Sequence, residues 1–269
     1  MPYVQTNGIN LYYELHGNGE PLVLIPGIGY GGWMWHKMIP GLAEHFQVIS
    51  IDNRGVGQSD KPAGPYSAQM LAADIAGMLD DFGISKAYIM GHSMGGFIAQ
   101  AFALDYSQRV DRLILSATNF GGPRHVPISP EAMAVLTDLS GDPIERLRRG
   151  IVISCAPGFA DANPEFVDYW VNYRLQNPLD PAGYQSQLAI GLGLISEAAS
   201  FEHRLEQITA PTLILFGAED KVVPKGNAAL LAAKIPDSWV EILPDVGHFF
   251  PYEAPEAANE AVVRFLKGG

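Results

Sequence analysis

Gly91-His92-Ser93-Met94-Gly95-Gly96 is the stretch that decides the fold of this 269-residue chain. It satisfies the pattern G-x-S-x-G, follows the apolar run Tyr88-Ile89-Met90 and precedes a helical pattern over residues 97–104. A serine on a tight strand-to-helix turn has strained backbone angles, and its neighbours must be small to avoid a clash. The turn also places the hydroxyl at a helix N-terminus, where backbone N–H groups favour negative charge. The motif therefore predicts a strand, a sharp turn carrying a nucleophilic Ser93, and a helix.

Short apolar runs of strand length lie on both sides of this motif and alternate with helical patterns. Helical spacing marks residues 71–82, which Gly83 ends, and a last helix is expected over residues 255–266. Apolar strands that alternate with helices are typical of a mostly parallel sheet flanked by helices. An alternating run over residues 8–15, closed by Gly17-Asn18-Gly19, predicts an opening hairpin. The strand runs are Leu22-Val23-Leu24-Ile25, Val48-Ile49-Ser50-Ile51-Asp52, Leu113-Ile114-Leu115, Thr212-Leu213-Ile214-Leu215-Phe216 and Trp239-Val240-Glu241-Ile242-Leu243.

The alternation breaks between residues 119 and 205. Three helix-like pieces occur there, over residues 130–139, 143–153 and 164–175, with many prolines and no clear strand. Because the strand pattern then returns, the segment is an insertion in one domain. We predict a core domain of residues 1–118 and 206–269 and a helical cap of residues 119–205, which forms a lid over the site. The alternative is a helical excursion without function.

A serine nucleophile needs a base, and the base needs a group that orients it. His248 lies in the loop after the last apolar strand, and Asp220 lies in the loop after the strand before it. These loops and the Ser93 turn all emerge at the carboxyl ends of parallel strands, where open α/β sheets build their sites. The chain order Ser, Asp, His is the order that the elbow motif demands. We predict the triad Ser93, Asp220 and His248, with Glu219 as the alternative acid.

Other reactive residue types have simpler expected roles. His92 beside the nucleophile is expected to pack within the elbow, whereas His125 and His203 flank the cap and remain candidates for substrate contact. Cys155 has no strand-turn-helix context and is expected to be a buried structural thiol. No histidine and acid group shows metal-ligand spacing, so we expect neither a catalytic metal nor a cofactor.

Acyl transfer also needs donors for the developing oxyanion, the oxyanion hole. One is expected to be the backbone N–H of Met94, and the second should come from the loop Pro26-Gly27-Ile28-Gly29-Tyr30-Gly31-Gly32. We predict the N–H of Ile28, with Gly29 as runner-up; the alternative for this loop is a flexible glycine turn. Such donors each supply about 10²–10³ in rate.

Substrate contacts are predicted from both the core domain and the cap. Gly29 from the glycine-rich loop and Trp170 from the cap are predicted to touch substrate. The apolar character of the cap predicts small or medium uncharged acyl groups. Its apolar and aromatic residues are Phe159, Phe166, Tyr169, Trp170, Tyr173, Leu188, Leu192 and Leu194.

The composition of the chain limits which binding partners and which cellular location are expected. The chain has 29 acidic against 17 basic residues, a formal net charge of −12, so it repels phosphate backbones and nucleic acid is not expected as a partner. Its single cysteine excludes an intramolecular disulfide. Neither a secretory signal nor an apolar run of membrane length is visible. We expect a cytoplasmic protein without membrane contact, a monomer or homodimer, that acts on a small ester or lactone.

These motifs, together with Asp52-Asn53-Arg54-Gly55-Val56-Gly57-Gln58-Ser59-Asp60, Pro211-Thr212 and Gly247-His248, resemble the α/β-hydrolase superfamily. Within it the chain is similar to carboxylesterases and 3-oxoadipate enol-lactonase-like members, over nearly its whole length except the cap. The family usually has His-Gly where this chain has Pro26-Gly27. The resemblance disfavours haloalkane dehalogenases and epoxide hydrolases, which carry an aspartate at the elbow. It ranks meta-cleavage C–C hydrolases lower, since these typically show Gly-Asn-Ser and Ser-Gly-Pro-Gly.

The resemblance and the residues together predict a serine carboxylesterase that works through an acyl-enzyme intermediate. Lactone or C–C bond hydrolysis by the same triad is the alternative, and perhydrolase or haloperoxidase side activity would use the same residues. A ligand receptor that retains the triad is the alternative from another class.

Overall fold

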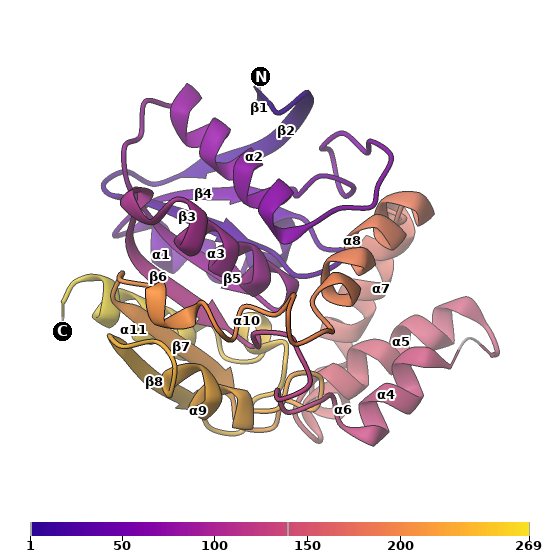
Figure 1. Cartoon of the computed structure of the whole chain (residues 1–269). Helices are drawn as coiled ribbons and strands as arrows, with labels where there is room; N and C mark the ends of the chain where they lie inside the picture. Colours follow the sequence, from indigo (N-terminus) through magenta and orange to yellow (C-terminus); the bar gives the residue numbers. More distant parts are fainter. Residues whose placement is uncertain (1, 139, 269) are drawn as a thin grey trace.

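The computed structural model describes residues 2–138 and 140–268, and within them eight strands form one sheet in the order β1-β2-β4-β3-β5-β6-β7-β8 (Figure 1). β1 and β2 pair antiparallel, as do β2 and β4, and the other pairs are parallel. The predicted mostly parallel α/β sheet is therefore confirmed. The strands are β1 Tyr3–Thr6, β2 Ile9–His16, β3 Pro21–Ile25, β4 Gln47–Ile51, β5 Ala87–His92, β6 Val110–Ser116, β7 Thr212–Gly217 and β8 Ser238–Leu243.

Helices cover both faces of the sheet because the central strands are apolar on both sides. Ile25 of β3 packs in the core with α2 (Ala68–Asp81), α3 (Met94–Asp105) and α9 (Gly226–Ala232). Its neighbour Leu24 packs on the opposite face with α1 (Ile39–Ala43) and α11 (Pro255–Leu266). The sheet and its flanking helices also include four short helices of about one turn: η1 Gly32–Trp35, η2 Ser107–Arg109, η3 Leu205–Gln207 and α10 Phe250–Glu253.

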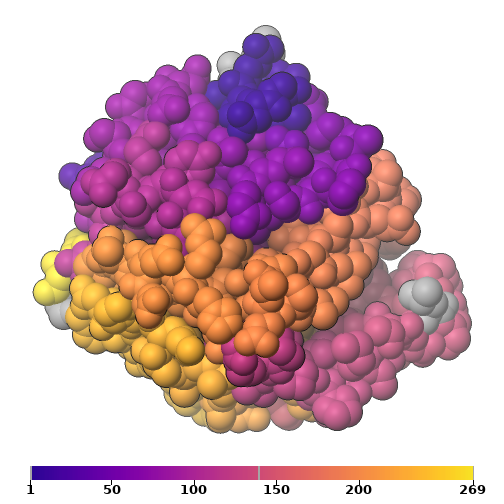
Figure 2. Space-filling model, viewed as in Figure 1, coloured from indigo at the N-terminus to yellow at the C-terminus, as the bar shows by residue number. Residues whose placement is uncertain are grey.

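The segment between β6 and β7 is helical and lies beside the sheet, with α4 and α5 projecting as a lobe (Figures 1 and 2). Three of its helices match the predicted pieces, except that Leu139 lies outside the described residues. The sequence pattern missed α6 and α8, because α6 is a single turn and three glycines interrupt the apolar spacing of α8. The helices are α4 Pro130–Thr137, α5 Pro143–Ser154, α6 Phe159–Ala162, α7 Pro164–Gln176 and α8 Pro181–Gly193.

The opening hairpin is placed differently from the prediction. β1 pairs with β2 around a turn at Asn7-Gly8, where both residues have positive φ. The turn at residues 17–19 only ends β2, whose second partner is β4 rather than the strand that follows it in sequence. The predicted turn at the glycines is present, but which strand pairs with which depends on sheet order.

A buried ion pair between Arg54 and Asp74 links the loop after β4 to α2. Arg54 donates to both carboxylate oxygens of Asp74 at 2.6 and 2.5 Å, and their side chains are 7% and 2% exposed. Asn7 also donates to Asp74. Asp74→Ala should therefore lower the free energy of unfolding by about 3–5 kcal/mol in urea titrations, because the Arg54 charge stays buried without its partner. Glu241→Gln is the control: it breaks the exposed pair with Arg264 and should change stability much less, and equal losses would contradict the prediction.

Candidate active site

Ser93 occupies the sharp turn between β5 and α3. Its backbone angles are φ 56° and ψ −118°, an unfavourable conformation for a residue with a side chain. Two hydrogen bonds hold it: Ser93 N–H donates to the Ser116 carbonyl at 2.9 Å, and Thr118 Oγ1 donates to the Ser93 carbonyl at 2.8 Å. A Cβ on Gly95 would collide with the Ile25 carbonyl, so the glycine is needed for α3 to approach β3. The surrounding structure thus imposes the strained conformation of Ser93.

Asp220 and His248 come together from the loops that follow β7 and β8. His248 Nδ1 lies 2.7 Å from Asp220 Oδ2, and both residues are buried. The other carboxylate oxygen of Asp220 accepts the N–H groups of Val222 and Val223, both at 2.8 Å. With Nδ1–H donated to the carboxylate, the imidazole keeps Nε2 as its proton acceptor. The alternative acid, Glu219, is exposed and takes no part in this contact.

Ser93 and His248 line one cavity of about 410 Å³. In the described residues no hydrogen bond joins Ser93 Oγ to His248, a contact that in ligand-free sites often tightens only when substrate binds. The apolar residues of the wall include Ile28, Tyr30, Met34, Leu136, Leu147, Ile151 and Phe249, and its charged residues are Arg146, Arg174 and Asp138. Residues of α4, α5, α7 and α8 thus cover a site whose reactive groups come from the sheet.

The predicted oxyanion loop forms a type II turn over residues 27–30. Tyr30 N–H donates to the Gly27 carbonyl at 3.2 Å, and Gly29 has φ 71°, the positive φ that this turn needs at its third residue. Gly29 N–H donates to Gln187 Oε1 at 2.9 Å, whereas Ile28 N–H has no hydrogen-bond partner within the described chain. Met94 begins α3, so its N–H has no acceptor inside the helix. The geometry thus favours Ile28 over the runner-up Gly29.

The structure does not bring the two predicted substrate contacts to this cavity. Trp170 is 2% exposed and packs edge-on or tilted against Trp33, Phe249 and Tyr252, because α7 turns its apolar face toward the core. Gly29 lies on the wall of a neighbouring hollow instead. Trp170 is therefore a packing residue in this structure, which corrects the sequence prediction.

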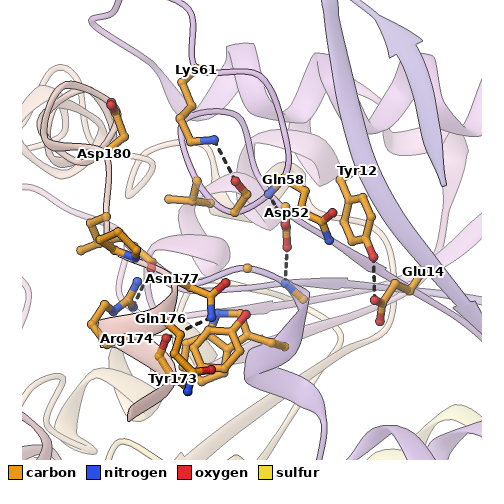
Figure 3. A pocket seen from close by; sticks show the side chains of 18 residues that line it. Tyr12, Glu14, Asp52, Gln58, Lys61, Tyr173, Arg174, Gln176, Asn177 and Asp180 are labelled. Carbon is orange, nitrogen blue, oxygen red and sulfur yellow. Dashed lines mark hydrogen bonds between the residues drawn. The ribbon is translucent and has the colours of Figure 1, made fainter. Parts of the chain in front are cut away.

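The neighbouring hollow measures about 380 Å³ and lies between the N-terminal strands and the end of α7 (Figure 3). It is more polar than the Ser93 cavity. Asp52 accepts the N–H groups of Gly32 and Gln58 at 2.8 and 2.7 Å, and burial raises the pKa of its carboxyl. Arg174 and Leu179 line both spaces, so the Arg174 side chain forms part of the partition between them.

Three other histidines and the cysteine take no part in the contact between His248 and Asp220. His92 is buried against His248 with its ring centroid at 4.8 Å, and burial, then the charge of His248, hold its pKa well below the usual value. His125 contacts the Gly122 carbonyl and His203 contacts Glu197, and neither lines the Ser93 cavity. Burial raises the pKa of the Cys155 thiol.

Among residues 2–138 and 140–268, no three His, Cys, Asp or Glu side chains are grouped to hold a metal ion. Over the same residues, each helix is too short or too polar to cross a bilayer.

A family model, a curated relative and two solved structures all match this chain over most of its length. The family model described as alpha/beta hydrolase fold matches residues 20–255. The 2-hydroxy-6-oxononadienedioate/2-hydroxy-6-oxononatrienedioate hydrolase of Burkholderia vietnamiensis is 31% identical, over 96% of this chain and 91% of that protein. The enol-lactonase of Burkholderia xenovorans is 28% identical with a TM-score of 0.82, over 99% of this chain and 100% of that one. A thermophilic esterase of Thermogutta terrifontis is 30% identical with a TM-score of 0.78, over 100% and 97% of the two chains.

Proposed function

Since the chain belongs to the α/β-hydrolase fold family and is a hydrolase, we propose that it cleaves carboxylic esters of small to medium acyl groups through an acyl-enzyme on Ser93. The observation that carries this proposal is the 2.7 Å contact between His248 and Asp220 at the wall of the cavity that holds Ser93. The proposal includes residues 119–205 as the cap and Ile28 and Met94 as the oxyanion donors.

Each proposed step uses groups already in the site. Ser93 Oγ attacks the ester carbonyl while its proton passes to Nε2 of His248. The N–H groups of Met94 and Ile28 stabilise the resulting oxyanion, and Asp220 stabilises the imidazolium. The intermediate collapses as His248 returns the proton to the leaving alkoxide. Water then gives a proton to His248 and attacks the acyl-enzyme, and as the acid is released His248 returns that proton to Ser93 Oγ.

The wall of the cavity supports the acyl-size proposal. Leu136, Leu147 and Ile151 give it an apolar side that suits a short hydrocarbon chain. We expect a preference for p-nitrophenyl acetate or butyrate over decanoate in kcat/KM. A clear preference for decanoate would contradict a small acyl site.

A second candidate is hydrolysis of a lactone or of a C–C bond in an anionic substrate. The specific observation in its favour is Arg174, which lines the Ser93 cavity and can attract a carboxylate. The Burkholderia vietnamiensis relative is named for a dioate substrate, which agrees with the two arginines that line the cavity beside the acidic Asp138. Enol-lactone and 2-hydroxy-6-oxo acid substrates, assayed beside p-nitrophenyl butyrate at equal concentration, distinguish these reactions by kcat/KM.

Covalent labelling tests the proposed nucleophile. A fluorophosphonate should react with one residue, which mass spectrometry should locate at Ser93, and excess p-nitrophenyl butyrate should slow the labelling. The wild-type protein should also turn over the ester. Neither label nor turnover would contradict an activated serine, and a receptor that retains the triad would then be the better explanation.

A further inference from the structure

Gln187 is a fully buried polar residue of α8 whose side chain reaches into the sheet domain. Its Oε1 accepts the Gly29 N–H at 2.9 Å, and its Nε2 donates to the Arg54 carbonyl at 2.9 Å. One partner is a donor and the other an acceptor, so the amide can satisfy both in one orientation only. Gln187 therefore joins α8 to the oxyanion loop and to the loop after β4.

Arg174 of α7 binds the carbonyl group of the same glycine, Gly29. Its Nη2 donates to the Gly29 carbonyl at 2.9 Å, and its guanidinium lies over the rings of Tyr30 and Trp33, 5.2 and 5.8 Å from their centroids. Figure 3 shows Arg174 extending from the end of α7 in the neighbouring hollow. Both polar backbone groups of Gly29 are thus held by helices inserted between β6 and β7.

The hydrogen bonds select one shape of the turn. Types I and II differ by the orientation of the peptide between the second and third residues, here Ile28 and Gly29, and Gln187 accepts the N–H of that peptide. The glycine tolerates either orientation without a side-chain clash of its own, so the turn needs an external contact to select one. The adjacent Ile28, whose N–H belongs to the preceding peptide, lines the cavity that Ser93 also lines. An oxyanion donor is effective only when it is held about 2.7–3.1 Å from the developing charge.

We propose that these helices assemble the oxyanion hole, with Gln187 as the positioning residue: by holding the Gly29 N–H it fixes the place of the neighbouring Ile28, and with it the Ile28 N–H. The inference rests on the proposed function, since it assigns the loop a role in acyl transfer. It assigns the inserted helices a task besides covering substrate: the hole is complete only while α8 is seated on the sheet domain.

Gln187→Met tests the hydrogen bonds at nearly constant side-chain length. It should lower kcat for p-nitrophenyl butyrate by about 10–100-fold, part of the 10²–10³ that a lost donor costs, with KM changed less than about threefold. Affinity for a butyl boronic acid, which mimics the tetrahedral intermediate, should fall in parallel. Gln185→Met is the matched control, since Gln185 lies exposed on the same helix and should leave kcat unchanged.

Gln187→Glu separates hydrogen bonding from packing. A protonated glutamic acid can accept from Gly29 and donate to the Arg54 carbonyl, so it should restore kcat relative to Gln187→Met at low pH. Burial raises the pKa of such a carboxyl. Above that pKa the carboxylate repels the Arg54 carbonyl, and kcat relative to wild type should fall as pH rises. Gln185→Glu should stay parallel to wild type at every pH.

The outcomes separate this inference from the proposed function. Wild-type kcat in Gln187→Met, or a pH profile of Gln187→Glu parallel to wild type, would overturn the role of Gln187 while Ser93-dependent turnover stands. An inactive, unlabelled wild-type protein would instead overturn the proposed function. If Gln187→Met does not fold, the pH profile of Gln187→Glu decides alone.

Discussion

Ser93→Ala should reduce kcat for p-nitrophenyl butyrate by roughly 10⁶-fold, the scale seen when a triad serine is removed. Ser154 also lines the cavity, but its hydroxyl donates to the Gly150 carbonyl at 2.8 Å, and among the described lining residues Ser93 is the serine that sits on the elbow. Binding and the oxyanion donors remain, so a residual rate of about 10³–10⁴ over water is expected. Stopped assays at high enzyme concentration measure this loss, and fluorophosphonate labelling should disappear with it.

The control for this variant is Ser107→Ala. Ser107 lies in η2, just before the start of β6, and therefore at the end of the strands that is opposite the site. Thermal unfolding of both variants should show that the fold is retained. Loss of turnover in both proteins, or retention in Ser93→Ala, would contradict a nucleophilic Ser93.

Asp220→Asn should reduce kcat by about 10⁴-fold with little change in KM. The asparagine keeps the size of the side chain, but its amide can donate to His248 Nδ1. That bond favours the tautomer whose proton is on Nε2, which cannot then accept the proton of Ser93. The imidazolium formed during reaction also loses the carboxylate 2.7 Å away that stabilises it.

Glu219→Gln is the matched control, one residue away and chemically the same change. Glu219 is exposed, and Asp220 provides the carboxylate at His248, so kcat of Glu219→Gln should remain within about twofold of wild type. A large loss in Glu219→Gln with a mild loss in Asp220→Asn would exchange the two roles and overturn the assignment.

The fold could be predicted wherever the signal is local. The apolar run before Ser93 and the glycines around it correspond to β5, a strained turn and the start of α3. The pairing of β2 could not be predicted, because a strand's neighbours are set by sheet order, and β2 pairs with β4 across 32 to 38 residues of sequence. Likewise, α8 was missed because its glycines lower the helix propensity of the segment. The helix forms all the same because contacts with the sheet domain outweigh that propensity.

For the candidate site, too, the residues marked by a local pattern could be predicted and the others could not. Sequence placed Ser93, Asp220 and His248 on loops after parallel strands, and such loops meet at one edge of a sheet whatever the rest of the chain does. It could not place Trp170, because a helix of mixed apolar and aromatic residues does not say which residues face substrate and which face the core. It also missed Arg174 in the cavity wall, since an arginine on a helix gives no signal before its neighbours are known.

The sequence by itself therefore determined the α/β class with its mostly parallel sheet, the elbow and the three residues proposed as the triad, because strand patterning and turn chemistry act within a few residues. Only the tertiary structure decided which N–H of the glycine-rich loop stays unpaired, since the group that occupies Gly29 comes from Gln187, 158 residues away. It also decided the lining of the cavity, which is formed where α4, α5, α7 and α8 meet the ends of the strands. Long-range contacts of this kind depend on how the helices pack, and no local pattern encodes them.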